Sequence, residues 1–528
     1  MLILRNISYK HPDKEQLFDG INLIVNNHDK IALIGHNGSG KSTLLKIICG
    51  EQKITQGELL TNETPYYIPQ VFGQFNHLTI AQALHVEQKL YALGEILAGR
   101  ATEELMDTLA DDWTIDERCL EALDQWHLAG LKLTQGMHTL SGGQKTKVFL
   151  AGITIHRPKL VLLDEPSNHL DTAGRKLLYE FIESTSSTLL VVSHDRTLLK
   201  LLNTVCELNK NGIKRYGGNY DFYTQQKGIE VKALNQDVKS KEKALRKAKE
   251  QERETTERQQ KLDARGKKKQ EKAGVARIMM NTLRNNAEKS STKIKSVHSE
   301  KIDGISHDLQ TLRSALPEID KIKFGFEDST LHKGKILFSA IDINFSYAYK
   351  NLWKENLNFQ ITSGERIHLQ GLNGSGKTSL MKIMLGKLSP TIGKVFRVLT
   401  NAVYIDQDYS LIQDQLTVYE QAQTYNDAAL EEHEVKVRLN RFLFTNGDWN
   451  KVCSKLSGGE RMRLMLCCLN MYKESPDLII LDEPTNNLDV QNIDILTAAI
   501  NAYKGTLIVV SHDFHFLEQI YMERTIAL

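Results

Sequence analysis

The feature that most constrains this chain is an internal repeat, because six short motifs occur twice and in the same order. GHNGSGKS at residues 35–42 returns as GLNGSGKT at residues 371–378, which is 336 positions later. The other five motifs that recur in the same order are NxSY, YIxQ, LSGG, LDEP and VVSHD. A repeat of this length predicts one domain design present in two copies within the 528 residues.

The spacing between matching motifs shows where the copies differ. It falls from 337 residues between Gln70 and Gln407 to 316 between the two LSGG motifs. The first copy therefore carries about 21 additional residues, which we place within residues 94–123.

The segment between the copies is strongly basic. Residues 227–300 contain 21 Lys or Arg against 11 Asp or Glu, although the whole chain has a net charge of only +2. Long stretches without Gly or Pro predict two helices, with a turn at residues 265–274 and Pro317 near the end of the second helix. We therefore expect a helical hairpin here.

The two glycine-rich motifs match the pattern GxxxxGK[ST], and each lies between an apolar run and an apolar helical pattern. Glycines in such a loop let backbone N–H groups face phosphate oxygens at a helix N-terminus. Lys41 and Lys377 are expected to reach the β- and γ-phosphates, and Ser42 and Thr378 to bind Mg²⁺. Two matches in register predict two nucleotide sites.

Two apolar strands, LVLLDE and LIILDE, each end in an acidic pair. Strands of α/β folds present their carboxyl ends to the sheet edge where ligands bind. We expect Asp164 and Asp482 to support Mg²⁺, and Glu165 and Glu483 to orient or deprotonate the attacking water. A single Asp-Glu pair is better explained as a solvated or helix-capping pair, and it is the repeat that favours a catalytic function.

Three further residue types recur at matching positions. His194 and His512 are candidates to sense the γ-phosphate. Gln70 and Gln407 are candidates to bind both Mg²⁺ and the attacking water. Tyr9 and Tyr347 are candidates to stack on the adenine ring. Packing at a sheet edge remains the alternative explanation for the two tyrosines.

This set of motifs resembles that of ATP-binding cassette proteins. Two cassettes in one chain without membrane spans resemble the ABC-F family, and the match covers both copies and the segment between them. YGGNYDFY at residues 216–223 resembles the start of that family's linker, and the Arg/Lys-rich hairpin resembles its tRNA-interaction arm. The resemblance implies an α/β fold with two P-loop ATP-binding cassette domains, at residues 1–220 and 318–528. Each has a mixed sheet core and a helical subdomain, and a long α-helical hairpin linker at residues 221–317 joins them.

By the same resemblance, the cassettes close head to tail around two ATP molecules and hydrolyse ATP to ADP and phosphate. Each site combines the P-loop, glutamine, acidic pair and histidine of one cassette with the LSGG motif of the other. The catalytic residues implied are Glu165, Glu483, His194 and His512. The ATP-binding residues implied are Tyr9, Gly35, His36, Asn37, Gly38, Ser39, Gly40, Lys41, Ser42, Thr43, Gln70, Ser141, Gly142, Gly143, Tyr347, Gly371, Leu372, Asn373, Gly374, Ser375, Gly376, Lys377, Thr378, Ser379, Gln407, Ser457, Gly458 and Gly459. The Mg²⁺ ligands implied are Ser42, Gln70, Asp164, Thr378, Gln407 and Asp482.

The expected partner is the ribosome, through 23S rRNA and P-site tRNA. In the ABC-F family the arm reaches from the E site toward the P-site tRNA and the peptidyl-transferase region, and family members relieve stalls, tune initiation or elongation, or protect against antibiotics. The sequence does not choose among these actions. The RNA-contacting candidates are Arg265, Lys267, Lys268, Lys269, Lys272, Arg277 and Arg284. A solvated helix with internal ion pairs, or RNA binding without ribosome specificity, is the alternative for the arm.

Several classes of protein fit less well. No run of about 18 apolar residues and no signal peptide pattern occur, so we expect a cytoplasmic chain without membrane contact. The six cysteines lack metal-site spacing.

The main rival is the ATPase component of a membrane ABC transporter. DNA-bound ABC proteins insert coiled coils inside one cassette, and a scaffold without turnover is disfavoured by Glu165 and Glu483. We expect no DNA partner, and a monomer with intramolecular cassette closure.

Overall fold

The computed structural model describes residues 1–11, 16–209, 212–272, 292, 296–313, 334–347, 350–372, 374–398, 401–472, 474–486 and 488–528. They form two compact units. One unit contains both copies of the repeat, which we call the first cassette (Met1–Tyr223) and the second cassette (Ile322–Leu528). The other unit, Thr224–Lys321, is the helical unit.

The core of the first cassette is a six-stranded sheet in the order β5-β6-β7-β3-β8-β9, in which only the β8 and β9 pair is antiparallel. Strands β6 and β7 are buried along their whole length. Continuous apolar runs of this kind are typical of parallel strands that are covered on both faces. The strands are β3 (Lys30–Ile34), β5 (Tyr66–Ile68), β6 (Leu160–Asp164), β7 (Thr188–Val192), β8 (Thr204–Asn209) and β9 (Gly212–Tyr216).

An antiparallel sheet and a set of helices complete the first cassette. The sheet has the order β2-β1-β4, and its strands are β1 (Leu2–Lys10), β2 (Gln16–Val25) and β4 (Gln56–Thr61). The helices are α1 (Lys41–Ile48), α2 (Ile80–Ala83), α3 (Glu87–Leu97), α4 (Glu103–Leu109), α5 (Ile115–Gln125), α6 (Gly142–His156), α7 (Thr172–Ser184) and α8 (Arg196–Lys200), with 3-10 turns η1 (Gly73–Phe75) and η2 (Met137–Thr139).

The second cassette repeats this architecture, with sheets in the orders β16-β17-β18-β14-β19, β13-β10-β15 and β11-β12. Its strands are β10 (Ile336–Asn344), β11 (Ser346–Tyr347), β12 (Lys350–Asn351), β13 (Leu357–Thr362), β14 (Arg366–Gln370), β15 (Ile392–Arg397), β16 (Ala402–Ile405), β17 (Leu478–Asp482), β18 (Thr506–Val510) and β19 (Arg524–Ala527). Its helices are α11 (Lys377–Met384), α12 (Val418–Gln423), α13 (Glu432–Arg441), α14 (Gly458–Leu469), α15 (Val490–Ala502) and α16 (Phe514–Gln519), with the 3-10 turn η4 (Cys453–Lys455).

The additional residues of the first cassette are helical. Between α2 and the LSGG motif the first cassette has α3, α4 and α5, whereas the fully described equivalent stretch of the second cassette has only α13 after α12. Helices α5 and α13 each end 15 residues before the LSGG motif, so they are equivalent and the additional helices are α3 and α4. The predicted placement within residues 94–123 is therefore right for α4 and the end of α3 and wrong for α5.

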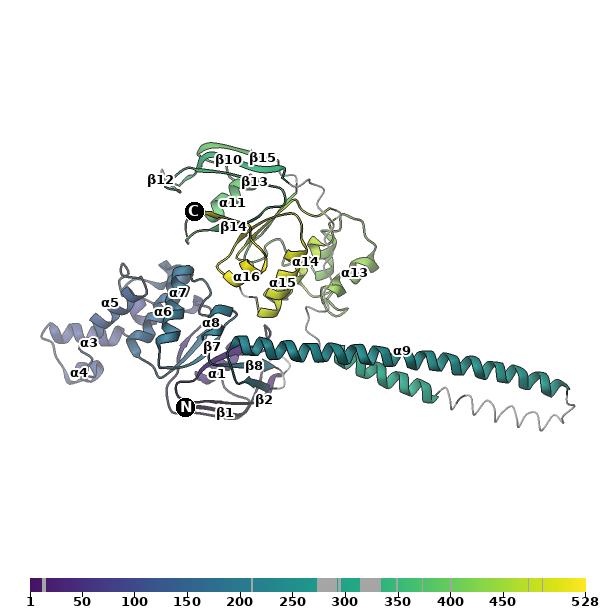
Figure 1. The fold of residues 1–528 in the computed structure, drawn as a ribbon. Helices are drawn as coiled ribbons and strands as arrows, with labels where there is room; N and C mark the ends of the chain where they lie inside the picture. Colours follow the sequence, from purple (N-terminus) through teal and green to yellow (C-terminus); the bar gives the residue numbers. More distant parts are fainter. Residues whose placement is uncertain are drawn as a thin grey trace. The chain divides into compact units, whose positions relative to one another are not determined.

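Helix α9 (Tyr220–Lys272) begins in the first cassette and continues into the helical unit, which also contains a second helix formed by residues 296–313. At 1.5 Å per residue, the 53 residues of α9 span roughly 80 Å. The second helix runs along part of α9 (Figure 1), where Lys241 pairs with Asp308 and Arg313 with Glu242, both at 2.6 Å. The expectation of paired helices is thus confirmed for these residues.

The predicted turn at residues 265–274 is wrong for residues 265–272, which belong to α9. Residues 265–272 include five Lys or Arg together with Gln and Glu, which are good helix formers. Gly266 costs a helix only about 1 kcal/mol relative to alanine, which is too little to end a long helix. Residues 273–291 and Pro317 lie outside the described residues.

Two chain-wide observations complete the description. None of the helices in the described part of the chain combines the length and apolar character that a membrane crossing needs. All six cysteines are described, and each is a free thiol.

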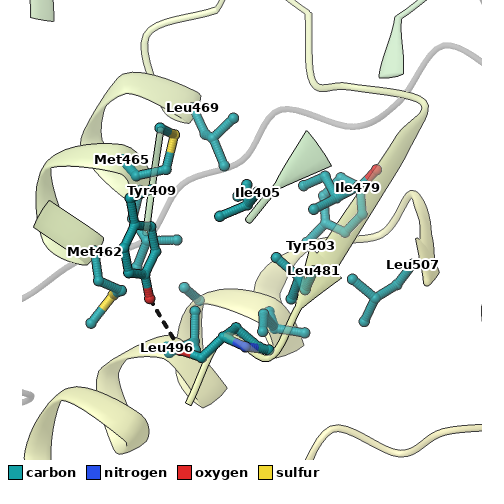
Figure 2. A pocket seen from close by; sticks show the side chains of 14 residues that line it. Ile405, Tyr409, Met462, Met465, Leu469, Ile479, Leu481, Leu496, Tyr503 and Leu507 are labelled. Carbon is teal, nitrogen blue, oxygen red and sulfur yellow. Dashed lines mark hydrogen bonds between the residues drawn. The ribbon is translucent and has the colours of Figure 1, made fainter. Parts of the chain in front are cut away.

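An apolar cavity lies in the core of the second cassette, between α14, α15 and strands β16 to β18 (Figure 2). It leaves about 20 Å³ for the centre of a water-sized sphere. The hydroxyl group of Tyr409 faces the lining but donates to the carbonyl oxygen of Pro484 at 3.1 Å. Met465 and Ala499 line the cavity, whereas the equivalent positions of the first cassette hold Phe149 and Phe181. Smaller side chains at these two positions account for the space.

Filling the cavity should stabilise the second cassette. We predict that Ala499→Val adds about 1 kcal/mol to the free energy of unfolding, since two buried methyl groups gain about 0.8 kcal/mol each and valine costs about 0.6 kcal/mol of helix propensity. Calorimetry should then show the unfolding transition of this cassette raised by about 2–4 °C.

The matched control is Ala422→Val, because Ala422 is fully buried in α12 but does not line the cavity. It should lower stability by about 1–3 kcal/mol through overpacking. Equal destabilisation by both variants would contradict the assignment of free space to Ala499.

Candidate functional site

Each P-loop connects a core strand to a helix through a glycine in the left-handed region. Gly40 precedes α1 with φ of 95°, and Gly376 precedes α11 with φ of 96°. A Cβ atom at Gly40 would lie 2.8 Å from side-chain atoms of Leu17 and Phe18. Glycine is therefore required here by backbone angle and by space, and the helix starts with its N–H groups facing the loop.

The P-loop lysines fold back onto their own loops. Nζ of Lys41 donates to the carbonyl oxygens of Gly35 at 2.7 Å and His36 at 3.2 Å. Nζ of Lys377 donates to the equivalent carbonyl oxygens of Gly371 at 2.7 Å and Leu372 at 3.0 Å. Burial lowers the pKa of both lysines. Each loop thus holds its cation where phosphate oxygens are expected.

The other P-loop candidates lie in the same loops or in the first turn of the following helix. Gly38 and Gly374 also have positive φ, at 80° and 83°. The hydroxyl oxygens of Ser39 and Ser375 are buried and have no hydrogen-bond partner among the described residues. The remaining described candidates are Asn37, Ser42 and Thr43 in the first cassette and Thr378 and Ser379 in the second. Asn373 lies outside the described residues.

The Asp of each acidic pair ends a core strand, at the edge expected from the sequence. Asp164 ends β6, where its carboxylate accepts hydrogen bonds from the Tyr67 hydroxyl at 3.3 Å and from Ser42. Asp482 ends β17 and accepts from the Tyr404 hydroxyl at 2.8 Å. Burial raises the pKa of both aspartates.

Mg²⁺ fits the donor set around Asp164. Its Oδ1 atom is buried and has no hydrogen-bond partner among the described residues, and the Ser42 side chain bonds to this carboxylate. Carboxylate and hydroxyl oxygens are the ligands that Mg²⁺ prefers. Ser42 and Asp164 would hold the ion in the first cassette, with Thr378 and Asp482 as their counterparts. Bound there, Mg²⁺ would neutralise charge on the phosphates.

The tyrosines at the Asp side chains were not among the predicted site residues. Tyr67 and Tyr404 occupy the same position in YYIPQ and VYIDQ, three residues before the repeated glutamine. Their repetition was the available signal. Each tyrosine hydroxyl donates to Oδ2 of its Asp, and at Asp164 this leaves Oδ1 without a hydrogen-bond partner among the described residues.

Glu165 and Glu483 share a backbone conformation that the sequence did not indicate. Both have positive φ, at 51° and 50°. The backbone N–H of each donates at 2.8 Å to the neighbouring strand, to Val192 and to Val510 respectively. A non-glycine residue held in this region costs on the order of 1–3 kcal/mol, and such residues cluster at functional sites. The strain places each carboxylate beside its histidine.

Each glutamate faces the histidine of its own cassette. Nε2 of His194 lies 3.3 Å from Oε1 of Glu165, and Nε2 of His512 lies 3.4 Å from Oε1 of Glu483. The backbone N–H of each histidine also donates to the other carboxylate oxygen of its glutamate at 3.3 Å. The glutamate and histidine predicted to act together are therefore in contact.

Burial sets the protonation of both pairs. It raises the pKa of Glu165 to about 8 and that of Glu483 to about 7. It lowers the pKa of His194 to about 3 and that of His512 to about 4. The histidines are thus neutral at physiological pH, and the glutamates titrate near neutrality, where a carboxylate can accept a proton from water.

The two LSGG motifs begin helices in the same way. Ser141 caps α6, and its hydroxyl accepts from the Gln144 N–H at 3.3 Å. Ser457 caps α14 and accepts from the Glu460 N–H at the same distance. The glycines that follow, Gly142 and Gly143 in α6 and Gly458 and Gly459 in α14, form the first turns. Their pairing with the opposite P-loops stays a prediction.

Direct contacts join the two cassettes near these sites. The backbone N–H of Asn37, in the first P-loop, donates to Oδ2 of Asp489 at 2.9 Å. Arg196 of the first cassette donates to Asp494 and, at 3.3 Å, to Oε1 of Gln519. Sequence reasoning missed Asp489, although LD follows the acidic pair in both copies and was the available signal.

The remaining candidates lie at the borders of the sites or in the helical unit. Gln70 and Gln407 follow β5 and β16, and both are half-buried. Tyr9 is buried against Phe18, with ring centroids 6.1 Å apart, whereas the Tyr347 hydroxyl hydrogen-bonds Ser379 at 3.2 Å. Their adenine contacts stay predictions.

Some of the RNA-contacting candidates lie in α9 and others lie beyond its end. Arg265 is exposed on α9, and Lys267, Lys268, Lys269 and Lys272 belong to the same helix. Arg277 and Arg284 lie outside the described residues. Contact of any of these residues with RNA stays a prediction.

Comparison with known proteins agrees with a duplicated nucleotide-binding domain. The family model described as ABC transporter matches residues 18–168 and 354–486. The putative ATP-binding protein YdiF of Bacillus subtilis (strain 168) is 31% identical, over 98% of this chain and 79% of its own. The ribosome protection protein VmlR of the same organism is 30% identical, over 98% of this chain and 85% of its own.

Solved structures support the same fold. An RNase-L inhibitor structure covers 99% of this chain and 87% of its own, with a TM-score of 0.61 and 18% identity. The complex of archaeal ribosomal stalk protein aP1 with archaeal ribosome recycling factor aABCE1 gives a TM-score of 0.60 at 19% identity, with the same coverage. At these identities the likeness concerns the fold alone.

Removing both candidate bases should stop turnover while leaving the sites intact. We predict that the double variant Glu165→Gln, Glu483→Gln lowers kcat for ATP hydrolysis about 100-fold or more, because glutamine cannot accept the proton of the attacking water. Phosphate release and binding of a fluorescent ATP analogue are the measurements. The control is Glu180→Gln on exposed α7 surface. Unchanged hydrolysis in the double variant would refute the assignment.

Proposed function

Because the chain belongs to the ABC-F family of twin-cassette ATPases, we propose that it is a translation factor that binds the ribosome in its ATP-bound form. It occupies the E site and acts through its helical arm on the P-site tRNA and the peptidyl-transferase centre of 23S rRNA. The action either relieves stalled ribosomes or protects them from antibiotics. The observation that carries this proposal is the distribution of charge along α9.

Positive charge gathers in the C-terminal part of α9. Residues 227–257 hold 9 Lys or Arg against 7 Asp or Glu, a local balance of +2. Residues 258–272 hold 7 Lys or Arg against 2 Asp or Glu. This gives a balance of +5 in a stretch about half as long as the first. A helix that only needs to remain soluble has no need of such a gradient, since balanced charges serve that purpose.

The nearly balanced part of α9 contains several ion pairs. Arg246 pairs with Glu250 at 3.2 Å, and Arg253 pairs with Glu257 at 3.1 Å. Lys241 and Glu242 pair with the second helix, as described above. Each of these pairs lies before residue 258 on α9, in the stretch where acidic and basic residues are nearly balanced. The excess of positive charge lies in residues 258–272.

RNA phosphate is the natural partner of this excess. Each Lys or Arg that neutralises a phosphate releases a counterion, so affinity falls steeply as salt rises. The relative VmlR is named a ribosome protection protein, which supports ribosomal RNA and tRNA over RNA in general.

The two ATP sites would supply the switch. Residues from both cassettes meet around Asn37 and Asp489, and the LSGG motifs offer further N–H groups and hydroxyls to a γ-phosphate. ATP then favours the closed form, and hydrolysis removes the group that bridges the halves. Tight ribosome binding is therefore restricted to the ATP state.

The test is co-sedimentation of the Glu165→Gln, Glu483→Gln variant with ribosomes. We predict binding with ATP and at least about tenfold weaker binding with ADP. Neutralising five bases of α9 to glutamine should also weaken the ATP-dependent binding and reduce its dependence on salt. The five are Arg265, Lys267, Lys268, Lys269 and Lys272.

A matched control changes five exposed lysines to glutamine in the preceding part of the same helix. They are Lys232, Lys239, Lys243, Lys247 and Lys249. It removes equal charge and should retain most of the binding. Absence of ribosome binding with either nucleotide would refute the proposal, and recovery of the protein in a membrane fraction with a partner would favour the ATPase component of a membrane ABC transporter.

A further inference from the structure

The two cassettes differ at two positions that face the opposite nucleotide site. The first turn of α7 carries Thr172 and Arg175, whereas the equivalent positions on α15, 318 residues later, carry Val490 and Ile493. The repeat is otherwise close here, with LD before each helix. Polar side chains in one copy and apolar ones in the other give the two sites different neighbours.

Both polar residues contact the histidine of the second cassette. Oγ1 of Thr172 lies 3.3 Å from Nδ1 of His512. The Arg175 guanidinium donates to the carbonyl oxygen of His512, also at 3.3 Å. The first cassette thus holds both the ring and the backbone of His512, whose Nε2 faces Glu483. A bond at Nδ1 fixes the ring orientation and the tautomer presented at Nε2.

Val490 and Ile493, the equivalent residues of the second cassette, form no such hydrogen bonds to His194. Val490 packs against the apolar core of the first cassette, and Ile493 lines a cavity together with Glu165 and His194. Neither side chain can donate or accept a hydrogen bond. Nδ1 of His194 is buried and has no hydrogen-bond partner among the described residues. The ring of His194 is therefore restrained by packing and by Glu165 alone.

We propose that Thr172 and Arg175 are positioning residues that the first cassette supplies to the second ATP site, and that the two ATP sites are unequal for this reason. Hydrolysis at the second site requires the first cassette to hold His512 against Glu483. Hydrolysis at the first site has no such requirement.

Arg175 also lies next to the first site, which makes the selectivity of its effect testable. Its guanidinium is 3.7 Å from the carboxylate of Asp195, the residue after His194. Asp195 keeps other partners if Arg175 is removed, because it accepts from the Tyr179 hydroxyl at 2.5 Å and from the N–H groups that begin α8. Loss of Arg175 should therefore disturb the second site much more than the first.

The experiment exchanges the two residues for those of the other cassette in a Glu165→Gln background, in which turnover reports the second site, and measures ATP hydrolysis of the full chain without ribosomes. We expect Thr172→Val, Arg175→Ile to lower kcat about tenfold, because a misplaced His512 weakens the transition state. KM for ATP should change by less than about twofold. Thr172 lines a cavity with Gly371 and Lys377, but among the described residues neither Thr172 nor Arg175 hydrogen-bonds the second P-loop, so the P-loop keeps its own contacts. Arg175→Lys with Thr172 intact should recover most of the rate.

A mutant cycle with His512→Ala separates positioning from a general loss of structure. Once His512 is alanine, Thr172→Val, Arg175→Ile should lower the remaining single-turnover rate by less than about twofold. The control Lys176→Ala removes a neighbouring exposed charge from α7 and should leave kcat unchanged. Thermal unfolding of each variant identifies any that fail to fold.

Three results would overturn the proposal. An unchanged kcat in Thr172→Val, Arg175→Ile would show that these contacts do not position His512. An undiminished loss in the His512→Ala background would assign their effect to another group. An unchanged kcat in His512→Ala alone would refute the role of the histidine itself. Because the assay contains no ribosomes, none of these results bears on the ribosomal role.

Discussion

The carboxylate of Asp489 accepts hydrogen bonds from two parts of the chain that lie far apart in sequence. One comes from the N–H of Asn37 in the first P-loop, and another from the N–H of Asn492 in its own helix. Burial alone would raise the pKa of Asp489, but these donors bring it below its ordinary value. The group therefore stays ionised at neutral pH, with donors from both cassettes on its carboxylate. The first P-loop is thus joined directly to the second cassette through this anion.

Much of the fold followed from the repeat. The apolar runs before GxNGSGK and LDE predicted buried parallel strands, and β3, β6, β14 and β17 lie where those runs occur. The glycine at each P-loop end and the acidic pair at each strand end also lie as expected, because local sequence fixes a strand, a turn and a helix start.

Other features depended on contacts that one sequence does not display. The left-handed backbone of Glu165 and Glu483 comes from strand pairing with Val192 and Val510, and glutamate gives no local sign of it. The cavity beside Ala499 depends on which residues face it across three elements. The extension of α9 through residues 265–272 reflects a helix strong enough to include Gly266, where a turn was expected.

The two cassettes share their catalytic contacts but differ in the residues that face each other. Glutamate and histidine pair at nearly the same distance in both cassettes, and the P-loop lysines make matching bonds. The differences lie on the surfaces that each cassette presents to the other, as with Thr172 and Val490. Two sites with the same catalytic groups therefore have different neighbours, and the proposed inequality of the two sites rests on this difference.

The central claim is that ATP held between the two cassettes controls binding to the ribosome, where the basic part of α9 contacts RNA. Cryo-electron microscopy of the Glu165→Gln, Glu483→Gln variant on ribosomes with ATP tests it most directly. We predict ATP at both P-loops, each nucleotide also contacted by the LSGG motif of the opposite cassette, and the C-terminal part of α9 against RNA. Ribosome-bound protein with ATP held by single cassettes, or with α9 away from RNA, would contradict the claim.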